Sequence, residues 1–330
     1  MLKAEGVPAG AAELDPGNNR IAVLVPCFNE EVAVAKVVAD FRAALPEATI
    51  YVYDNNSTDR TVEVARRAGA VVGREIHQGK GNVVRRMFAD VDADIIVLVD
   101  GDATYDAASA RALIARLLED RLDMVLAARV HREEAAYRVG HQFGNRLFSA
   151  SVAWLFNATF TDILSGYRVF SRRFVKSFPV LSRGFEIEIE LTVHALELEL
   201  PTAEIPTPYY ARPAGSASKL STWRDGLRIL STIVNLCRTE RPLAFFSSLG
   251  GALAVVSVVL AIPVFATYLE EGVVPRFPTA ILSTGLMLLA FLFVVAGLIL
   301  DTVTKGRREV KLLAYLAQRA PGFDYDRRQS

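Results

Sequence analysis

Two long uncharged stretches near the end of the chain restrict most strongly what it can fold into. Leu243–Thr267 runs for 25 residues and Pro278–Leu300 for 23 residues without a charged side chain. A helix of about 20 residues crosses the roughly 30 Å of a membrane's hydrocarbon core, and soluble helices rarely lack polar residues on every face over such lengths. The sequence therefore predicts two transmembrane helices, with a pair of buried core helices as the alternative.

The charges around these stretches predict how they cross the membrane. The connecting segment Tyr268–Phe277 carries two glutamates and one arginine. The two stretches together form a hairpin of residues 242–302, and the segments on either side of it, its outer flanks, are basic. By the positive-inside rule, both outer flanks lie in the cytoplasm. We therefore expect an integral membrane protein whose large N-terminal domain and both termini are cytoplasmic. The basic flanking residues are Arg238, Arg241, Lys305, Arg307, Arg308 and Lys311.

The segments outside the domain and the hairpin have their own compositions. Residues 1–19 are rich in alanine, glycine, glutamate and proline without a continuous apolar core, so we expect a flexible tail rather than a secretory signal. Residues 221–241 place apolar side chains at helical spacing and predict an amphipathic helix in the membrane interface. Residues 303–330 predict a basic cytoplasmic tail, within which Glu309–Gln318 is a second candidate interfacial helix.

Charge and cysteine content exclude several classes of protein. The 37 basic and 37 acidic residues balance, which argues against a general nucleic-acid binder. The balance conceals a local excess: residues 212–241 contain six basic and two acidic residues, a net charge of +4 that suits anionic lipid. Two cysteines far apart in the sequence, Cys27 and Cys237, imply no disulfide framework and suit a reducing compartment.

Residues 20–220 alternate short apolar runs with amphipathic ones, which is typical of a parallel sheet covered by helices. Ser57 is expected to cap the second helix. The expected strands are Ile21–Val25, Thr49–Tyr53, Val71–Val72, Asp94–Val99 and Met124–Ala128, and the expected helices are Glu30–Ala44, Thr58–Ala68, Lys80–Val91 and Ala107–Leu118.

The strand Asp94–Val99 leads into Asp100-Gly-Asp102, the most informative polar motif of this domain. The run is short and β-branched, so we expect a strand buried on both faces with the two carboxylates at its carboxyl end. Carboxylates this close repel each other unless a cation lies between them, and Mg²⁺ or Mn²⁺ bridged to a phosphate is the natural occupant. An acidic turn that caps the next helix is the alternative. We expect Asp102 to be the stronger metal ligand and Asp100 the weaker.

Three further polar clusters follow the other strands: Pro26–Glu30, Asp54–Asp59 and Gly79–Asn82. Each alone has an ordinary explanation as a turn or a helix start, but the carboxyl ends of parallel strands meet at one sheet edge, where ligands bind. There Asp54 can accept hydrogen bonds from a base or ribose, and the Gly-Lys-Gly bend lets Lys80 approach a ligand closely. The sequence lacks the glycine motifs of dinucleotide-binding Rossmann domains and P-loop ATPases. The clusters therefore favour a nucleoside-diphosphate site.

The motifs resemble, in order and spacing, inverting nucleotide-sugar glycosyltransferases of the GT-A fold and of family 2. Within that class the chain is most similar to polyprenyl-phosphate glycosyltransferases, which include dolichyl-phosphate mannose synthases and bacterial undecaprenyl-phosphate glucosyltransferases with two C-terminal spans. The implied fold is an α/β GT-A domain, with a mostly parallel sheet between helices, followed by an interfacial helix and two transmembrane helices. The motifs are Pro26-Cys-Phe-Asn-Glu30, Asp54-Asn-Asn-Ser-Thr-Asp59, Gly79-Lys-Gly81, Asp100-Gly-Asp102 and Asp162-Ile-Leu-Ser-Gly-Tyr-Arg168.

The resemblance implies a donor site for a nucleotide sugar of the GDP-mannose or UDP-glucose type, with Mg²⁺ or Mn²⁺ held by Asp102 and Asp100. Thr104 stands where dolichyl-phosphate mannose synthases usually have glutamine, so the remaining metal ligands stay open. The Gln-x-x-Arg-Trp motif of processive synthases is absent from the sequence, which disfavours polymerisation. The implied donor-site residues are Pro26, Asn29, Glu30, Asp54, Ser57, Lys80, Gly81, Asp100, Gly101 and Asp102, with Arg212 and Lys219 meeting the donor phosphates from the membrane side.

The implied reaction places a hexose on a polyprenyl phosphate, dolichyl or undecaprenyl, with inversion. A phosphate monoester is largely dianionic at neutral pH, so it needs little help from a general base. Bringing two anionic substrates together is harder, and arginine suits phosphate. Arg129, directly after a strand, and Arg138 are the candidates for the acceptor phosphate, and Arg129 joins Asp100 and Asp102 as a catalytic candidate.

Several assignments stay open at this stage. Glu186, Glu188 and Glu190 alternate, which fits either one wet face of a strand or a helix start with Glu190 directed at the active site. Asp162 and Arg168 flank a tight turn and either pair with each other or contact substrate. The isolated residues His141 and His194 are expected to be packing residues.

Two other functions fit the same motifs. One is a glycosyltransferase that acts on a lipid or protein hydroxyl, which would need a general base such as Glu190. The other is a non-catalytic, membrane-anchored protein that binds sugar nucleotides. The expected partners are a nucleotide sugar, a polyprenyl phosphate and a membrane but no nucleic acid, and homo-oligomerisation stays open. A bacterial or archaeal plasma membrane is favoured over the endoplasmic reticulum.

Overall fold

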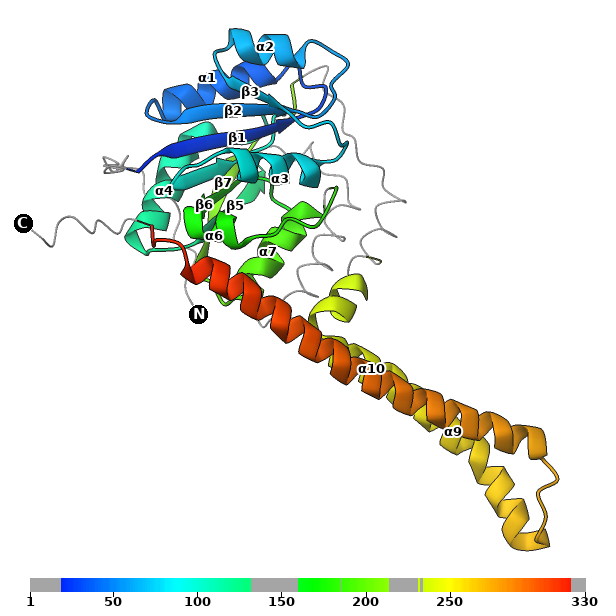
Figure 1. Cartoon of the computed structure of the whole chain (residues 1–330). Helices are drawn as coiled ribbons and strands as arrows, with labels where there is room; N and C mark the ends of the chain where they lie inside the picture. The colour runs from blue at the N-terminus through cyan, green and yellow to red at the C-terminus, as the bar shows by residue number, and fades with distance from the viewer. Residues whose placement is uncertain (1–18, 132–159, 185, 214–230, 232–233, 322–330) are drawn as a thin grey trace, which may run out of the picture. The chain divides into compact units, whose positions relative to one another are not determined.

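The computed structural model describes residues 19–131, 160–184, 186–213, 231 and 234–321. The chain forms two compact units, one from Met1–Gly226 together with Val310–Ser330 and one from Leu227–Glu309. The first is an α/β unit and the second is built from two long apolar helices (Figure 1). The sequence predictions at Arg138, His141 and Lys219 lie outside the described residues. So do the predicted N-terminal tail up to residue 18, the predicted C-terminal tail from residue 322 and most of the predicted amphipathic helix 221–241.

A seven-stranded sheet forms the centre of the α/β unit, in the order β3-β2-β1-β4-β6-β5-β7 (Figure 1). Strand β6 is antiparallel to both β4 and β5, and the other neighbouring pairs are parallel. The prediction of a mostly parallel sheet is therefore confirmed. The strands are β1 (Ile21–Cys27), β2 (Thr49–Asp54), β3 (Val71–Arg74), β4 (Ile95–Leu98), β5 (Met124–His131), β6 (Arg168–Ser171) and β7 (Thr202–Tyr209).

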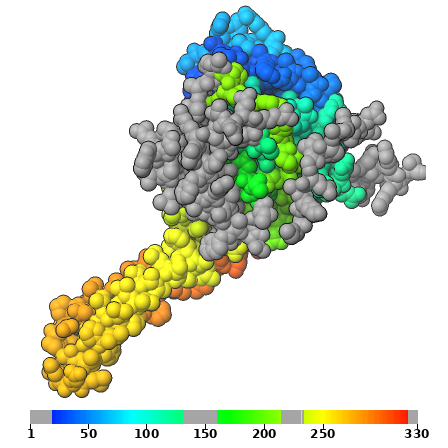
Figure 2. Space-filling view, turned by 180° about the vertical axis from the view of Figure 1, so that it is seen from behind, coloured from blue at the N-terminus to red at the C-terminus, as the bar shows by residue number. Residues whose placement is uncertain are grey.

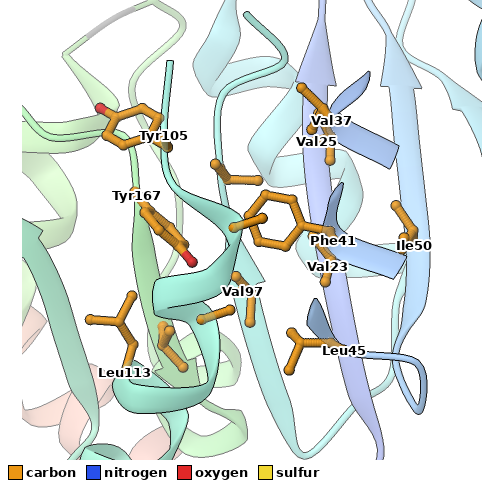
Figure 3. Close-up of a cluster of buried hydrophobic side chains, with 14 of the residues drawn as sticks. Val23, Val25, Val37, Phe41, Leu45, Ile50, Val97, Tyr105, Leu113 and Tyr167 are labelled. Atoms are coloured by element: carbon orange, nitrogen blue, oxygen red, sulfur yellow. The ribbon is translucent and has the colours of Figure 1, made fainter. Parts of the chain in front are cut away.

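Helices cover both faces of this sheet and form a hydrophobic core on each side. Along β1, Val23 and Val25 face one core while Ala22 and Leu24 face the other, as the pleat of a strand requires. Figure 3 shows the first core, where Phe41 meets Tyr167 edge to face at 5.9 Å between ring centres. The first core contains residues of α1 (Val34–Ala44), α2 (Thr61–Arg67), η1 (Ala107–Ser109) and α4 (Ala110–Glu119), and the second contains residues of α3 (Lys80–Asp90), α6 (Arg172–Ser177) and α7 (Ile187–Glu197).

Two boundaries near the carboxyl edge of the sheet differ from the sequence prediction. Strand β1 continues through Pro26 and Cys27, because its parallel pairing with β2 extends to Cys27 opposite Asp54. The prediction that Ser57 caps the second helix is wrong, since α2 begins only at Thr61. Ser57 instead accepts a hydrogen bond from the Asn29 N–H at 2.8 Å, and so it ties the end of β1 to the end of β2.

The second unit contains α9 (Pro242–Glu271) and most of α10 (Phe277–Leu316). Both helices are long and apolar enough to cross a membrane, with mean hydropathy values of 2.4 and 2.6 in their most apolar windows. They pack side by side (Figures 1 and 2), and small residues allow the close approach. A Cβ atom added to Gly250 would lie 2.8 Å from the Ala290 carbonyl oxygen, and Ser257 donates a hydrogen bond to the Ser283 carbonyl at 2.6 Å.

Helix α10 does not end where its uncharged stretch ends. It is a single helix of 40 residues, which corresponds to a length of about 60 Å. The helix predicted at Glu309–Gln318 is present as far as Leu316, where it forms the last turns of α10 and not an element of its own. In the α/β unit, Lys311 pairs with Glu197 at 2.6 Å and the Tyr315 hydroxyl donates to Asp123 at 2.9 Å. The polar side of these turns thus packs against protein.

Candidate active site

A pocket of about 340 Å³ lies where the segments following β1, β2 and β4 come together. The convergence of the polar clusters at one edge, expected from the sequence, is present. Residues that were not among the predicted donor-site residues also line the pocket, among them Gln78 and two members of the quoted motifs, Phe28 and Asn55. The predicted donor-site residues that line it are Pro26, Glu30, Lys80, Asp100, Gly101, Asp102 and Arg212.

Other predicted donor-site residues do not line the pocket but support the loops that do. The Asn29 side chain accepts a hydrogen bond from the Thr58 N–H at 2.8 Å. The buried Asp54 carboxylate accepts from the Ser57 N–H at 3.2 Å. Neither residue is among those that line the pocket. Their contacts hold the loops after β1 and β2 together, so the structure gives Asn29, Asp54 and Ser57 a supporting place at the site.

Asn55 shapes the segment that delivers Lys80. Its amide nitrogen donates to the carbonyl oxygens of Glu75 and His77 at 3.0 and 2.8 Å, and its amide oxygen accepts from the Gly79 N–H at 2.7 Å. Asparagine directly after a strand was part of the polar cluster noted in the sequence, but its partners lie about 20 residues further on. Sequence spacing alone does not reveal such a contact.

The Gly-Lys-Gly bend is pressed against the segment Ser182–Gly184. The Gly81 N–H donates to the carbonyl oxygens of Arg183 and Gly184 at 3.1 and 3.2 Å. A Cβ atom on Gly81 would lie 2.2 Å from the Ser182 carbonyl oxygen, and Gly79 has a φ of 129°. Glycine is therefore required at both positions, for close approach at Gly81 and for backbone conformation at Gly79.

The two aspartates of the acidic motif have different surroundings. Asp102 is buried, accepts a hydrogen bond from the Thr104 hydroxyl at 2.6 Å and pairs with Arg212 at 2.7 Å. Burial raises the pKa of Asp102, as does the charge of Asp100, while Thr104 and Arg212 act in the opposite direction. The hydrogen bond from Thr104 thus fixes the orientation of the Asp102 side chain.

Asp100 pairs instead with Lys80, which also pairs with Glu188. Lys80 is nearly buried, and burial alone would lower its pKa, but the charges of Asp100 and Glu188 outweigh burial and raise it. The helix alternative for the glutamate triplet is confirmed, because Ile187–Glu197 is α7. Which glutamate faces the site was left open by the sequence: Glu188 reaches Lys80, whereas Glu190 accepts from the N–H groups of Leu181 and Ser182, both at 2.8 Å.

Arg129 and Asp162 form a two-pronged ion pair beside this site. The Nε and Nη2 atoms of Arg129 donate to the two carboxylate oxygens of Asp162 at 2.7 and 2.6 Å. Burial opposes the ionised form of Asp162, but the pairing with Arg129 outweighs it and lowers the pKa of Asp162. Pairing between Asp162 and Arg168, one of the two alternatives, is therefore replaced by pairing with Arg129.

Arg168 is fully buried and organises the turn before β6. Its guanidinium donates to the carbonyl oxygens of Ser165, Ile163 and Glu188 at 3.1, 2.6 and 2.8 Å, and to the Thr192 hydroxyl at 2.9 Å. Burial lowers its pKa to about 10. Arg168 thus connects the 162–168 turn to α7, the helix that carries Glu188.

His194 on α7 is buried, as expected for a packing residue. Its Nε2 atom lies 3.0 Å from the Ser177 hydroxyl, which itself donates to the Phe174 carbonyl. The hydroxyl therefore accepts from Nε2–H, and Nδ1 is buried with no hydrogen-bond partner among the described residues. Burial, and to a smaller extent the charge of Lys311, lowers the pKa of His194 to about 3.

The lowered pKa of His194 predicts an acid-sensitive fold. Its folded-state pKa of about 3 lies below the ordinary value of 6.5, so between these values only the unfolded chain binds the proton. Stability therefore rises with pH across this window, and about 1.4 kcal/mol is lost on going from pH 7.5 to 5.5. Melting temperatures at the two pH values should differ by a few degrees less in His194→Gln than in the wild type; equal differences would contradict the prediction.

The acidic pair fits a divalent cation as part of a larger ligand set. Among the residues that the structure describes, no group of three or more His, Cys, Asp or Glu side chains is arranged to hold a metal. Asp100 and Asp102 offer the carboxylate oxygens that Mg²⁺ and Mn²⁺ prefer, and such cations are commonly held by one or two carboxylates plus substrate phosphates. The pair therefore fits a cation whose remaining ligands come from the substrate.

The fold and the pocket together define a GT-A-like α/β domain, with an acidic pair at the carboxyl edge of the sheet and basic side chains beside it. The chain belongs to glycosyl transferase family 2, whose sequence model matches residues 22–178. It is 32% identical over 297 residues to the glycosyltransferase AglJ of Haloferax volcanii, covering 89% of this chain and 97% of that relative. The family expected from the sequence is thereby confirmed, and the chain is a glycosyltransferase.

Two further comparisons bear on the same domain. A dolichyl-phosphate hexose transferase of Haloferax volcanii is 28% identical over 221 residues, which cover 67% of this chain and 95% of that relative. The crystal structure of glucosyl-3-phosphoglycerate synthase from Mycobacterium tuberculosis with Mn²⁺, UDP-glucose and glycerol 3-phosphate superposes with a TM-score of 0.54. The match covers 66% of this chain and 80% of that structure at 22% identity, and it supports the fold.

Proposed function

We propose that this glycosyltransferase moves a hexose from a nucleoside-diphosphate sugar to a polyprenyl phosphate at the cytoplasmic face of a membrane. The observation that carries the proposal is one pocket lined by Lys80, Asp100, Asp102 and Arg212, in a chain that also has two helices able to span a membrane. The name of the dolichyl-phosphate hexose transferase supports a polyprenyl phosphate acceptor. The structure solved with UDP-glucose supports a nucleotide-sugar donor for this fold.

The charges around the pocket suit the departure of a nucleoside diphosphate. Asp100 and Asp102 would hold Mg²⁺ or Mn²⁺, which would supply positive charge to the diphosphate. Arg212, paired with Asp102 at the pocket, and Lys80 add fixed positive charge beside it. The acceptor phosphate oxygen forms the new bond to the anomeric carbon from the opposite face, while the bond from that carbon to the diphosphate oxygen breaks. The product is inverted at that carbon, and the nucleoside diphosphate leaves.

Arg129 is our candidate for the acceptor phosphate. Strands β4 and β5 are each antiparallel to β6, so they run in the same direction and end at the same edge of the sheet. Arg129, near the end of β5, therefore lies at the edge that holds Asp100. The ion pair with Asp162 orients the Arg129 guanidinium, and the Arg129 side chain is 24% exposed. A guanidinium has five N–H donors, of which the two hydrogen bonds to Asp162 use only two, and its planar arrangement of donors suits a phosphate dianion.

The contacts of Glu190 weigh against a hydroxyl acceptor. Such a reaction needs a general base within reach of the hydroxyl, and Glu190 was one candidate for it. Its carboxylate instead accepts hydrogen bonds from Leu181 and Ser182. The phosphate acceptor needs no base, because it is already ionised.

The test uses the full-length protein in membranes with a panel of UDP- and GDP-sugars and labelled polyprenyl phosphate. We expect one nucleotide sugar to give a labelled lipid-phosphate sugar and an equal amount of free nucleoside diphosphate. Binding without release of the diphosphate would instead indicate a non-catalytic binding protein. Release of the nucleoside diphosphate only when an acceptor with a hydroxyl group is added would indicate a glycosyltransferase that acts on a lipid or protein hydroxyl.

The same assay tests the cation. Excess EDTA should abolish transfer, and added Mg²⁺ or Mn²⁺ should restore it, because the two aspartates alone leave the diphosphate charge uncompensated. Heat-inactivated membranes with the same additions provide the background. Full activity in excess EDTA would refute the metal role of Asp100 and Asp102 while leaving the transfer reaction itself intact.

A further inference from the structure

The Lys80 ammonium is shared between two carboxylates that differ in exposure. Side-chain exposure is 9% for Lys80, 8% for Glu188 and 30% for Asp100. Asp100 lines the pocket, whereas Glu188 is not among the lining residues. Lys80 therefore connects the carboxylate at the pocket surface to a second one buried beneath it.

The structure holds Glu188 firmly in this buried position. Its backbone carbonyl accepts hydrogen bonds from Arg168 at 2.8 Å and from Thr192 at 3.1 Å, which fix the first turn of α7. Its Oε1 atom meets Lys80, and its Oε2 atom is buried with no hydrogen-bond partner among the described residues. A buried carboxylate with one unsatisfied oxygen costs stability. Glu197 on the same helix also has a buried oxygen that is unsatisfied within the described part of the chain, and what distinguishes Glu188 is its contact with Lys80 at the site. That contact indicates a task beyond packing.

Charge balance at the acidic pair supplies such a task. A divalent cation held by Asp100 would repel the Lys80 ammonium, because Lys80 pairs with the same carboxylate. Glu188 opposes this repulsion because its negative charge lies on the buried side of Lys80 and is barely screened by solvent. Without it, Lys80 would compensate Asp100 alone and would compete directly with the cation.

We propose that Glu188 is a positioning residue for the cation of the donor site: it draws the Lys80 ammonium toward the buried side and so leaves Asp100 available to Mg²⁺ or Mn²⁺. This inference rests on the proposed function, since it concerns the cation that the donor diphosphate completes. Glu188 acts only through Lys80 and contacts neither cation nor substrate. Its effect is therefore expected on cation affinity and not on the fold alone.

The experiment measures Mn²⁺ binding to the purified full-length protein by electron paramagnetic resonance of the free ion, with UDP or GDP present. Glu188→Gln should weaken Mn²⁺ binding about tenfold, the size seen when outer partners of metal ligands are removed. Glu197→Gln is the matched control, because Glu197 lies on the same helix, is buried and pairs with Lys311. It should leave Mn²⁺ affinity unchanged.

A double variant separates positioning from a general loss of structure. If Glu188 acts through Lys80, Lys80→Met and Lys80→Met/Glu188→Gln should bind Mn²⁺ equally well, since contacting residues are non-additive. This comparison also stands if Glu188→Gln alone fails to fold. Unchanged affinity in Glu188→Gln, or a further loss in the double variant, would overturn the inference alone. A wild-type protein that binds no Mn²⁺ would overturn it together with the metal part of the proposed function.

Discussion

Asp102→Asn is expected to abolish sugar transfer while the protein stays folded. The change removes a negative charge from the cation site but keeps an oxygen that can accept the Thr104 hydrogen bond of 2.6 Å. A metal ion contributes several kcal/mol of transition-state stabilisation, and 1.36 kcal/mol corresponds to a factor of ten in rate. We therefore expect transfer to fall by about three orders of magnitude. The measurement is labelled polyprenyl-phosphate sugar formed per minute at saturating donor.

Asp106→Asn is the matched control for this variant. Asp106 is a neighbouring aspartate whose carboxylate caps η1 by accepting from the Ser109 N–H at 3.1 Å, and it is not among the residues that line the pocket. Its loss should cost about 1 kcal/mol of stability at most and leave transfer near the wild-type rate. If the Asp102→Asn protein retained transfer, Asp102 would not be a ligand of the cation, whatever the control variant shows.

Arg168→Met is expected to produce the opposite result, a large loss of stability at a position that does not line the pocket. The fully buried guanidinium donates hydrogen bonds to the carbonyl oxygens of Ile163, Ser165 and Glu188. Methionine fills much of the volume but leaves these oxygens without their donor, and each buried unsatisfied group costs about 1–3 kcal/mol. We expect a loss of about 4 kcal/mol, which lowers the melting temperature by on the order of 10 °C.

An exposed arginine provides the comparison. Arg116 pairs with Asp120 at 2.9 Å on the surface of α4, where both side chains are more than 40% exposed. Surface pairs of this kind contribute about 0.5 kcal/mol or less, so Arg116→Met should melt close to the wild type. A similar melting temperature for Arg168→Met and Arg116→Met would show that the turn before β6 does not depend on the buried guanidinium.

Periodicity and local motifs were enough to predict most of the elements. The β-branched run before Asp100 reads as a strand buried on both faces, and β4 is such a strand. The two uncharged stretches read as long apolar helices, and α9 and α10 contain them. These features depend on residues next to one another in the chain, so the sequence carries them directly. The end of α10 was harder, because its last polar turns contact distant residues such as Glu197 and Asp123.

The same distinction between local sequence and distant contacts applies to the candidate site. The sequence by itself determined which chemical groups gather at the carboxyl edge of the sheet, because parallel strands bring their ends together and each cluster directly follows a strand or opens a helix. Only the tertiary structure decided the partners: Arg129 with Asp162, Arg212 with Asp102, and Lys80 with both Asp100 and Glu188. Glu188 lies 108 residues from Lys80 in the chain, and it is the register of α7, fixed in part by the buried Arg168, that turns Glu188 rather than Glu190 toward it. Pairing between charges depends on distance and burial, and neither is written in the local sequence.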